Sequence, residues 1–150
     1  MNAITLWKKC HGKPLGKWFF TKAICWKAPY FGSIQPLFEA LEPGRAVVSM
    51  RKRRAVQNHI GTVHAIAMCN LAELAAGVMM EVSVPATMRW LPKGMTVRYL
   101  KKATTGVTCE AVCAEISHLP ARDIIVATVL RDANNIIVCE ADITMYVSPK

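Results

Sequence analysis

Three of the polar residues in a mostly apolar stretch of the chain are of types that suit chemistry at a carbonyl group. Asn58, His64 and Glu73 fall within 16 residues, from 58 to 73. Hydrolysis at a carbonyl carbon needs a base or nucleophile to deliver water and a donor to stabilise the oxyanion. A carboxylate on an apolar helix is costly unless it is hydrogen-bonded, and Glu73 is the candidate base or nucleophile. The backbone N–H of Ala65, in the first turn of the same predicted helix, is the candidate oxyanion donor.

This stretch resembles a motif of the hotdog-fold thioesterases of the PaaI and 4-hydroxybenzoyl-CoA type. The family motif runs His-Gly-Gly, a short spacer, and then Leu-Ala-Glu or Leu-Ala-Asp. Here His64 and Leu71-Ala72-Glu73 fit that spacing, and the upstream Asn58-x-x-Gly61 fits as well. The resemblance covers roughly residues 43 to 147, and residues 28 to 34 are similar to a less characterised branch of the superfamily.

The resemblance implies a role for each matching residue. Glu73 takes the place of the catalytic carboxylate, Asn58 that of an Asn or Gln that positions the thioester or the water, and His64 that of a turn-bracing histidine. Two positions depart from the family pattern: Ala65-Ile66 replaces Gly-Gly, and Gly77 stands where some relatives have Thr or Ser. The first departure narrows the approach of the substrate to the backbone, and the second removes a hydroxyl that could hold the water.

Helical geometry adds a demand on how these residues are used. His64 and Glu73 are nine residues apart, and about 100° per residue puts them on opposite sides of one helix. One helix cannot direct both at one carbonyl, whereas two copies can. We therefore expect a homodimer, or a tetramer of two such dimers, with its sites at the subunit interface. Asn70, Glu73 and Gly77 share one stripe, so Asn70 is expected to orient Glu73 and Gly77 to leave room for substrate beside it.

The apolar pattern predicts the elements that position these residues. Nearly every side of a helix from about Gly61 to Met80 is apolar, with Thr62 as a plausible N-cap, so the helix must be covered on all sides. Strand patterns begin at Arg45 and recur at Thr87–Leu91, Met95–Lys102, Val107–His118, Asp123–Arg131 and Ile136–Val147. Short turn-rich separators favour antiparallel hairpins. The predicted class is α+β, a hotdog fold with an antiparallel sheet wrapped around one long central helix.

Residues 1 to 42 are predicted to form a helical extension packed on a single domain of residues 1 to 150. Lys17–Lys27 has apolar residues at helical spacing and ends before Pro29, and Phe31–Leu41 is expected to be a loop and a short helix. Trp7, Trp18 and Trp26 could share one helix face. Core packing and a helix lying on a membrane surface are both consistent with that pattern.

The positive charge lies in the N-terminal third of the chain. The formal net charge is +9, and residues 1 to 54 hold 11 Lys or Arg against two acidic residues, whereas residues 55 to 150 hold eight of each sign. This asymmetry favours an anionic partner, and a solvated basic face is the alternative. In a hotdog protein the phosphates of CoA suit these charges, with Arg51, Arg53, Lys101 and Lys102 as candidates. Arg51 to Arg54 would alternate faces if they continued the strand.

Several classes of protein are not favoured by the sequence. His64, Asn70 and Glu73 interrupt the longest apolar stretch, and lysines interrupt every candidate signal peptide, so we expect a cytoplasmic location, reduced cysteines and no stable membrane insertion. Cys109 and Cys113 are four residues apart on a predicted strand, a separation of about 13 Å that one metal ion cannot bridge. We expect no metal and no cofactor.

These observations predict an acyl-CoA thioesterase that uses a helix-borne Glu and a backbone oxyanion hole at a dimer interface. The alternative is a non-catalytic hotdog module that binds an acyl-CoA or a fatty acid, which the departures at Ala65-Ile66 and Gly77 favour. A nucleic-acid binder driven by the basic third is a weaker third alternative, and we expect no nucleic-acid partner.

Overall fold

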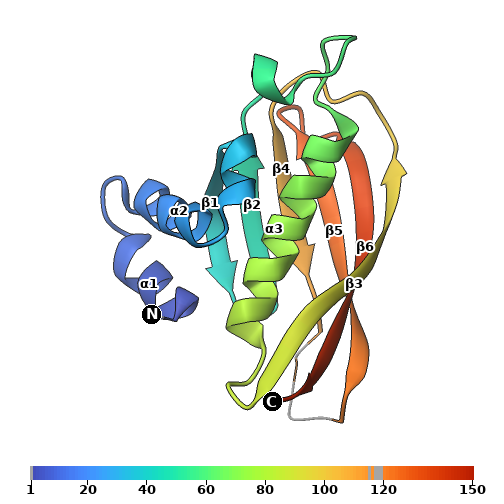
Figure 1. Cartoon of the computed structure of the whole chain (residues 1–150). Helices are drawn as coiled ribbons and strands as arrows, with labels where there is room; N and C mark the ends of the chain where they lie inside the picture. Colours follow the sequence, from blue (N-terminus) through green and yellow to red (C-terminus); the bar gives the residue numbers. More distant parts are fainter. Residues whose placement is uncertain (1, 115, 117–119) are drawn as a thin grey trace.

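The chain folds as one antiparallel sheet with a long helix across it (Figure 1). The computed structural model describes residues 2–114, 116 and 120–150. Its elements are α1 (Ala3–Cys10), α2 (Gly16–Lys27), the 3-10 helix η1 (Pro29–Ile34), β1 (Pro36–Glu42), β2 (Arg45–Met50), the 3-10 helix η2 (Arg54–Val56), α3 (Ala65–Ser83), β3 (Met88–Tyr99), β4 (Val107–Val112), β5 (Arg122–Asp132) and β6 (Ile137–Pro149). The described residues form a six-stranded sheet in the order β1-β2-β4-β5-β6-β3, and the architecture is the hotdog fold that the sequence predicts.

Helix α3 lies against the sheet and forms the centre of the core (Figure 1). Its own side chains Leu71, Leu74 and Met79 are buried. The small side chains of Ala72, Ala75 and Ala76, also buried, let the helix approach the strands closely. By length and composition alone α3 could also cross a membrane. Here 56% of that helix is buried inside the protein, so it is the core helix of the fold.

The prediction that α3 is covered on all sides is only partly correct. Ile66 is 57% exposed and Glu81 is exposed, while Glu73 and Gly77 are half-buried. These residues follow one another at helical spacing, so they form a stripe that the chain's own elements leave open. The apolar pattern could not reveal this, because a helix face covered by its own sheet and one covered by another subunit have the same composition.

Strand β1 replaces the predicted short helix before the Pro43-Gly44 turn. Pro36–Glu42 pairs antiparallel with Arg45–Met50, and Gly44 has a φ of 82°, a left-handed conformation that glycine adopts without steric cost. Leu, Ala and Glu favour helix locally, but the hairpin pairing and the burial of Phe38 outweigh that preference. The predicted continuation of the strand through Arg51 to Arg54 is also wrong, since β2 ends at Met50 and Arg54 begins η2.

Strand β3 is one long edge strand, where the sequence predicts two strands around a turn at residues 92 to 94. It pairs with β6 along its length, and the register shifts between Pro92 and Gly94. Proline has no N–H for a ladder, so it is tolerated in an edge strand with a local irregularity. Strand β4 ends at Val112, short of the predicted end at residue 118; residues 115 and 117–119 lie outside the described residues.

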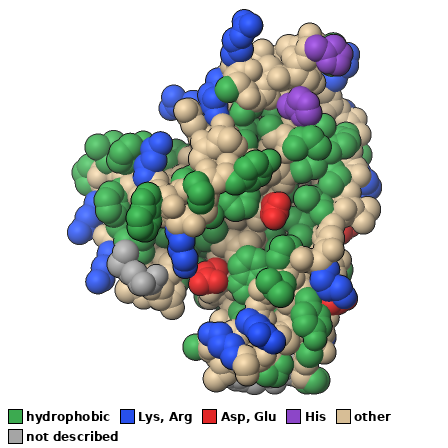
Figure 2. All heavy atoms as spheres, viewed as in Figure 1, with side chains coloured by type: hydrophobic (Ala, Val, Ile, Leu, Met, Phe, Trp, Pro, Cys, Tyr) green, Lys and Arg blue, Asp and Glu red, His purple; other side chains and the backbone are tan. Residues whose placement is uncertain are grey.

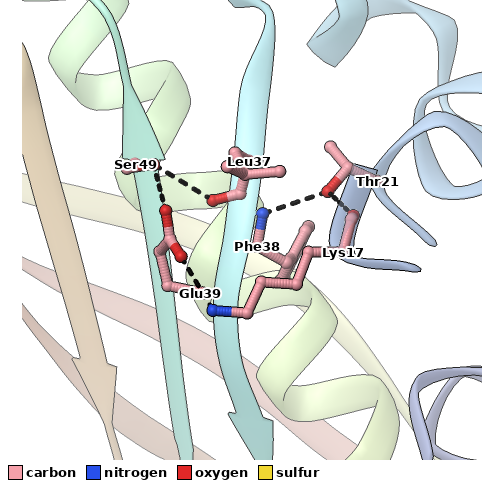
Figure 3. A network of polar contacts seen from close by, with 6 residues as sticks. All are labelled: Lys17, Thr21, Leu37, Phe38, Glu39 and Ser49. Atoms are coloured by element: carbon pink, nitrogen blue, oxygen red, sulfur yellow. Dashed lines mark hydrogen bonds and ion pairs between the residues drawn. The ribbon is translucent and has the colours of Figure 1, made fainter. Parts of the chain in front are cut away.

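At the opposite side of the sheet, α2 packs along the edge of β1 (Figure 3). The Thr21 hydroxyl accepts a hydrogen bond from the Phe38 N–H at 3.0 Å and donates one to the Lys17 carbonyl at 2.7 Å. Lys17 Nζ lies 3.0 Å from a Glu39 carboxylate oxygen, and Ser49 Oγ donates to the other at 3.0 Å. This network fixes α2 to the sheet and satisfies a backbone donor at the β1 edge.

Candidate functional site

His64 begins α3. Its backbone is extended (φ −65°, ψ 137°), and its Nδ1 accepts a hydrogen bond from the Ile66 N–H at 3.0 Å. The His64 N–H in turn donates to the Val56 carbonyl at 2.8 Å. The side chain thus caps the helix, which agrees with the turn-bracing role that the resemblance implies. The prediction of Thr62 as N-cap is wrong, because the helix begins at Ala65.

Asn58 shapes the loop before α3. Its Oδ1 accepts hydrogen bonds from the N–H groups of Ile60 at 3.2 Å and Thr62 at 3.0 Å, and its Nδ2 donates to Thr62 Oγ1 at 2.8 Å. Gly61 in this loop has a φ of 76°, which glycine adopts freely. Most of the hydrogen-bonding capacity of the Asn58 amide is therefore used to hold the loop that carries His64 and Ala65.

An open groove lies at the N-terminal end of α3. It has a volume of about 420 Å³, and its lining includes Asn58, Ala65, Tyr99, Lys101 and Lys102. The Ala65 N–H has no hydrogen-bond partner among the described residues, and Lys101 and Lys102 are exposed and form no ion pair there. A free first-turn amide and two ammonium groups suit an anion. The structure thus brings together four of the predicted site residues.

Tyr99 in this groove was not predicted as a site residue. Its hydroxyl lies 3.0 Å from Cys69 Sγ of α3. The hydrogen bond with Cys69, with a further contribution from burial, raises the pKa of Tyr99 to about 12, so the phenol stays protonated at neutral pH. Nothing in the sequence spacing links residues 69 and 99; β3 brings them together.

Glu73 lies in a second, mostly apolar pocket of about 340 Å³. Its lining includes Ile24 and Phe31 from the N-terminal segment, Leu74 and Val78 from α3, and Pro92 and Met145 from the sheet, together with the charged Lys27 and Glu81. Glu73 makes no hydrogen bond or ion pair with any described residue. Figure 2 shows acidic side chains among hydrophobic ones over α3. Such a carboxylate is free to act on a bound molecule.

Trp90 occupies the space beside Gly77 that was expected to stay open. A Cβ at residue 77 would lie 3.2 Å from Trp90 Cη2, so a larger side chain would require the ring to move. Trp90 Nε1 donates to a Glu81 carboxylate oxygen at 3.2 Å. Trp90 is therefore part of this pocket, and the sequence gives no sign of its role because its contact with Gly77 depends on how β3 crosses α3.

Three further predicted residues lie elsewhere. Asn70 is 6% exposed and lines another cavity, of about 210 Å³. Its Oδ1 has no hydrogen-bond partner among the residues that the structure describes, and Asn70 makes no hydrogen bond to Glu73. Arg51 lines a cavity of about 360 Å³ beside α2 and β1. Arg53 donates to the Ser33 carbonyl. None of the three lies in the groove of Ala65 or in the pocket of Glu73.

The two candidate catalytic groups therefore belong to different parts of one chain. The lining of the Ala65 groove and that of the Glu73 pocket have no residue in common. One part holds the free backbone N–H of Ala65, and the other holds the Glu73 carboxylate. Among the residues that the structure describes, no group of three or more His, Cys, Asp or Glu could hold a metal ion.

Solved structures confirm the fold. The crystal structure of the genomics protein APC5556 is 45% identical to this chain, with a TM-score of 0.86 and coverage of 99% of this chain and 98% of that one. A protein of unknown function from Pseudomonas aeruginosa, PA5026, described as a probable thioesterase, is 24% identical, with a TM-score of 0.76 and coverage of 81% and 88%. No curated protein matches the chain.

A third similar protein is SAV0944 from Staphylococcus aureus, called a thioesterase enzyme in one structure and a hypothetical protein in another. It is 17% identical, covers 81% of this chain and 99% of its own, and has TM-scores of 0.72 and 0.71. These two structures carry alanine in place of a glutamine and of a glutamate that are 15 positions apart. Asn58 and Glu73 have the same separation.

A family model agrees with these likenesses over most of the chain. It is described as a domain of unknown function, DUF4442, and it matches residues 16–147. That range begins with α2 and includes all six strands and α3. The chain belongs to the DUF4442 family, and its hotdog fold is that of solved proteins described as thioesterases.

Proposed function

We propose that this protein hydrolyses the thioester of an acyl-CoA, with Glu73 as base or nucleophile. The observation that carries the proposal is the Glu73 carboxylate, which has no partner among the described residues and lies in a mostly apolar pocket of about 340 Å³. Apolar pockets with a few polar groups are typical of small-molecule sites. The thioesterase descriptions of solved relatives, and the 15-residue separation that Asn58 and Glu73 share with two substituted positions of SAV0944, support it.

The two parts of the site suit the two parts of an acyl-CoA. The apolar lining around Glu73 is suited to an acyl group. In the Ala65 groove, Lys101 and Lys102 are suited to the phosphates of CoA, and the free Ala65 N–H and the protonated Tyr99 hydroxyl are donors for an oxyanion. Asn58 and His64 act on this chemistry through the backbone, since their hydrogen bonds hold the turn that directs the Ala65 N–H.

A homodimer paired through β3 would join the two parts. Within the described part of the chain, β3 has a sheet partner on one side only, and a long open edge strand is a ready surface for pairing. Trp90 and Pro92 of the Glu73 pocket lie near its start, and Tyr99 of the Ala65 groove lies at its end. Twofold antiparallel pairing sets the start of one β3 beside the end of the other. The pocket of one subunit would then adjoin the groove of its partner.

The reaction follows from these positions. As a base, Glu73 takes a proton from water, and the water oxygen attacks the thioester carbonyl carbon while the Ala65 N–H of the other subunit stabilises the oxyanion. The carbon–sulfur bond then breaks, and the CoA thiolate leaves and takes up a proton. As a nucleophile, Glu73 would attack the same carbon, and water would hydrolyse the resulting anhydride.

The test is hydrolysis of a panel of acyl-CoAs by the wild type and by Glu73→Gln. Glutamine keeps the size of the side chain but cannot accept the proton, so we expect kcat to fall at least about 100-fold. Glu81→Gln is the matched control, because Glu81 lines the same pocket but hydrogen-bonds Trp90, and it should retain most of the activity. A wild type that hydrolyses no acyl-CoA, or a Glu73→Gln variant as active as the wild type, would show that the catalytic assignment is wrong.

The second candidate function is binding of an acyl-CoA or a fatty acid without hydrolysis. The Trp90 ring favours it, because it fills the space beside Gly77, where a hydroxyl in some relatives could hold the water. Isothermal titration calorimetry with an acyl-CoA, followed by assay of free CoA, separates the two functions. Saturable binding without release of CoA would select the binding module, and release of CoA on binding would select the enzyme.

A further inference from the structure

The outward face of α2 is strongly apolar. Leu15, Trp18, Phe19 and Trp26 lie at helical spacing, and their fractional exposures are 80%, 54%, 56% and 87%. Tyr30 of η1 follows with 67%. These five residues are called the α2 aromatic face below. Large aromatic side chains this exposed and this close in sequence mark an interaction surface.

A firmly packed element carries this face. The inward side of α2 places Phe20, which is fully buried, between Trp7 and Phe38, with ring centroids 5.1 and 5.2 Å apart in edge-to-face geometry. Thr21 and Lys17 add the hydrogen bonds to β1 shown in Figure 3. The exposure of Trp18 and Trp26 is therefore a property of the folded helix, and their side chains are not available to the core.

Unpaired lysines surround the α2 aromatic face. Residues 2 to 38 contain six lysines and no acidic residue. Lys17 pairs with Glu39, whereas Lys8, Lys9, Lys13, Lys22 and Lys27 form no ion pair with any described residue. Lys22 Nζ lies 5.7 Å from the centroid of the Trp18 ring. In Figure 2 hydrophobic and basic side chains intermingle over the α1–α2 side of the molecule, where no acidic side chain is visible.

We propose that the α2 aromatic face docks the protein on an anionic lipid surface. Trp and Tyr favour the membrane–water interface, and lysines beside them are attracted to anionic headgroups. Charge complementarity favours lipid over a second copy of the chain. Twofold contact through α2 would bring the unpaired lysines of two copies together. Six acidic side chains elsewhere are already engaged in ion pairs, namely Glu39, Glu42, Glu110, Asp123, Glu140 and Asp142.

Docking in this way would bring the Glu73 pocket close to the lipid. Ile24 and Lys27 of α2, together with Phe31 of η1, contribute to the lining of that pocket. A helix that lies on the membrane would hold this side of the pocket near the headgroups. The docking itself does not depend on the proposed hydrolysis, and a protein that only binds acyl groups could use it equally well.

Flotation with lipid vesicles tests the proposal on the full chain. Wild type is mixed with vesicles of phosphatidylcholine alone or with phosphatidylglycerol added, at low and at high salt. We expect binding to the anionic vesicles, loss of binding at high salt, and a blue shift of tryptophan fluorescence on binding. Trp18→Ser with Trp26→Ser should abolish binding, and Lys22→Glu, which reverses one charge, should weaken it at least about fivefold.

Matched controls use exposed residues on the sheet. Ile125→Ser removes an apolar side chain of β5 that is 55% exposed, and Arg122→Glu reverses an exposed charge on the same strand that forms no ion pair with a described residue. Neither change should alter binding. Failure of the wild type to float with anionic vesicles, or equal flotation of the Trp18/Trp26 variant, would overturn the proposal. Sedimentation velocity adds a further outcome that would overturn the proposal. If the wild type does not bind vesicles but forms an oligomer, and the Trp18/Trp26 variant alone is dissociated, the α2 aromatic face contacts a second copy of the chain.

Discussion

At the residue scale, side chains around the start of α3 build the turn, and Asn58 also lines the groove of Ala65. Asn58 and His64 both satisfy backbone N–H groups there. The type and spacing of these residues in the sequence identified the turn correctly. Their hydrogen-bond partners could not be predicted, because these depend on where the helix begins, and it begins at Ala65 and not near Gly61.

The cap at His64 leads to a prediction about stability. In His64→Ala the Ile66 N–H loses its acceptor, so the free energy of unfolding should fall by about 1 kcal/mol. In His64→Asn a side-chain oxygen replaces Nδ1, and stability should stay near that of the wild type. Urea unfolding of the three proteins measures the difference. Equal stability of the alanine and asparagine variants would contradict the capping role.

Cys139 makes stability depend on pH in the alkaline range. Burial, the largest cause, raises the pKa of Cys139 from 9.0 to about 11. Because the folded state favours the protonated thiol, this contribution to stability is present below about pH 9 and is lost as the pH rises toward about 11. Urea unfolding at pH 8 and pH 10.5 should show this loss, and it should be smaller in Cys139→Ala. An identical pH dependence in both proteins would refute the assignment.

At the element scale, strong hydrophobic patterns in the sequence predicted α3 and most of the strands correctly. Weaker patterns gave wrong predictions for segments whose conformation is decided by pairing with a neighbouring strand. The apolar run of α3 and the alternation in β2, β5 and β6 are specified by burial along each segment. Residues 36–42 prefer helix locally but form β1 because β2 is beside them. The Pro92-Lys93-Gly94 segment has the composition of a turn, yet β6 holds it within one strand. Neither partner is visible in the local sequence.

The close approach of α3 to the sheet predicts the effect of a larger side chain. Ala75 is fully buried, so the added atoms in Ala75→Leu have no space, and the free energy of unfolding should fall by about 1–3 kcal/mol. Ala86→Leu is the control, because Ala86 is exposed and the change there should stay within about 0.5 kcal/mol. Chemical denaturation of both variants tests the packing, and an Ala75→Leu protein as stable as the wild type would show that a cavity lies there.

At the scale of the whole molecule, the features that one chain leaves incomplete all suggest a second copy. The open stripe of α3, the open edge of β3, and the separate locations of Ala65 and Glu73 each lack a counterpart within the described chain. The angle of about 180° that the sequence predicts between His64 and Glu73 does not apply in the structure, because His64 is the N-cap, has an extended backbone and lies outside the helix. Which surfaces meet could not be predicted, because the sequence does not show that β3 is an edge strand.

Two variants can remove one half of the site each without disturbing the fold. Glu73→Gln removes the base. Ala65→Pro removes the N–H donor at a helix position that tolerates proline, and the extended backbone of His64 is compatible with a following proline. Ala65→Gly, which keeps the N–H, is the control for the second change. Each of the two variants should be inactive alone, whereas Ala65→Gly should retain activity.

The central claim is tested most directly by mixing the Glu73→Gln and Ala65→Pro proteins and measuring acyl-CoA hydrolysis after the subunits exchange. A mixed dimer has one intact site, with Ala65 from the Glu73→Gln chain and Glu73 from the Ala65→Pro chain. Its other site lacks both groups. Random exchange should therefore restore about a quarter of the wild-type activity. If wild type is active but the exchanged mixture remains as inactive as its components, both groups act within one chain, which contradicts the shared site.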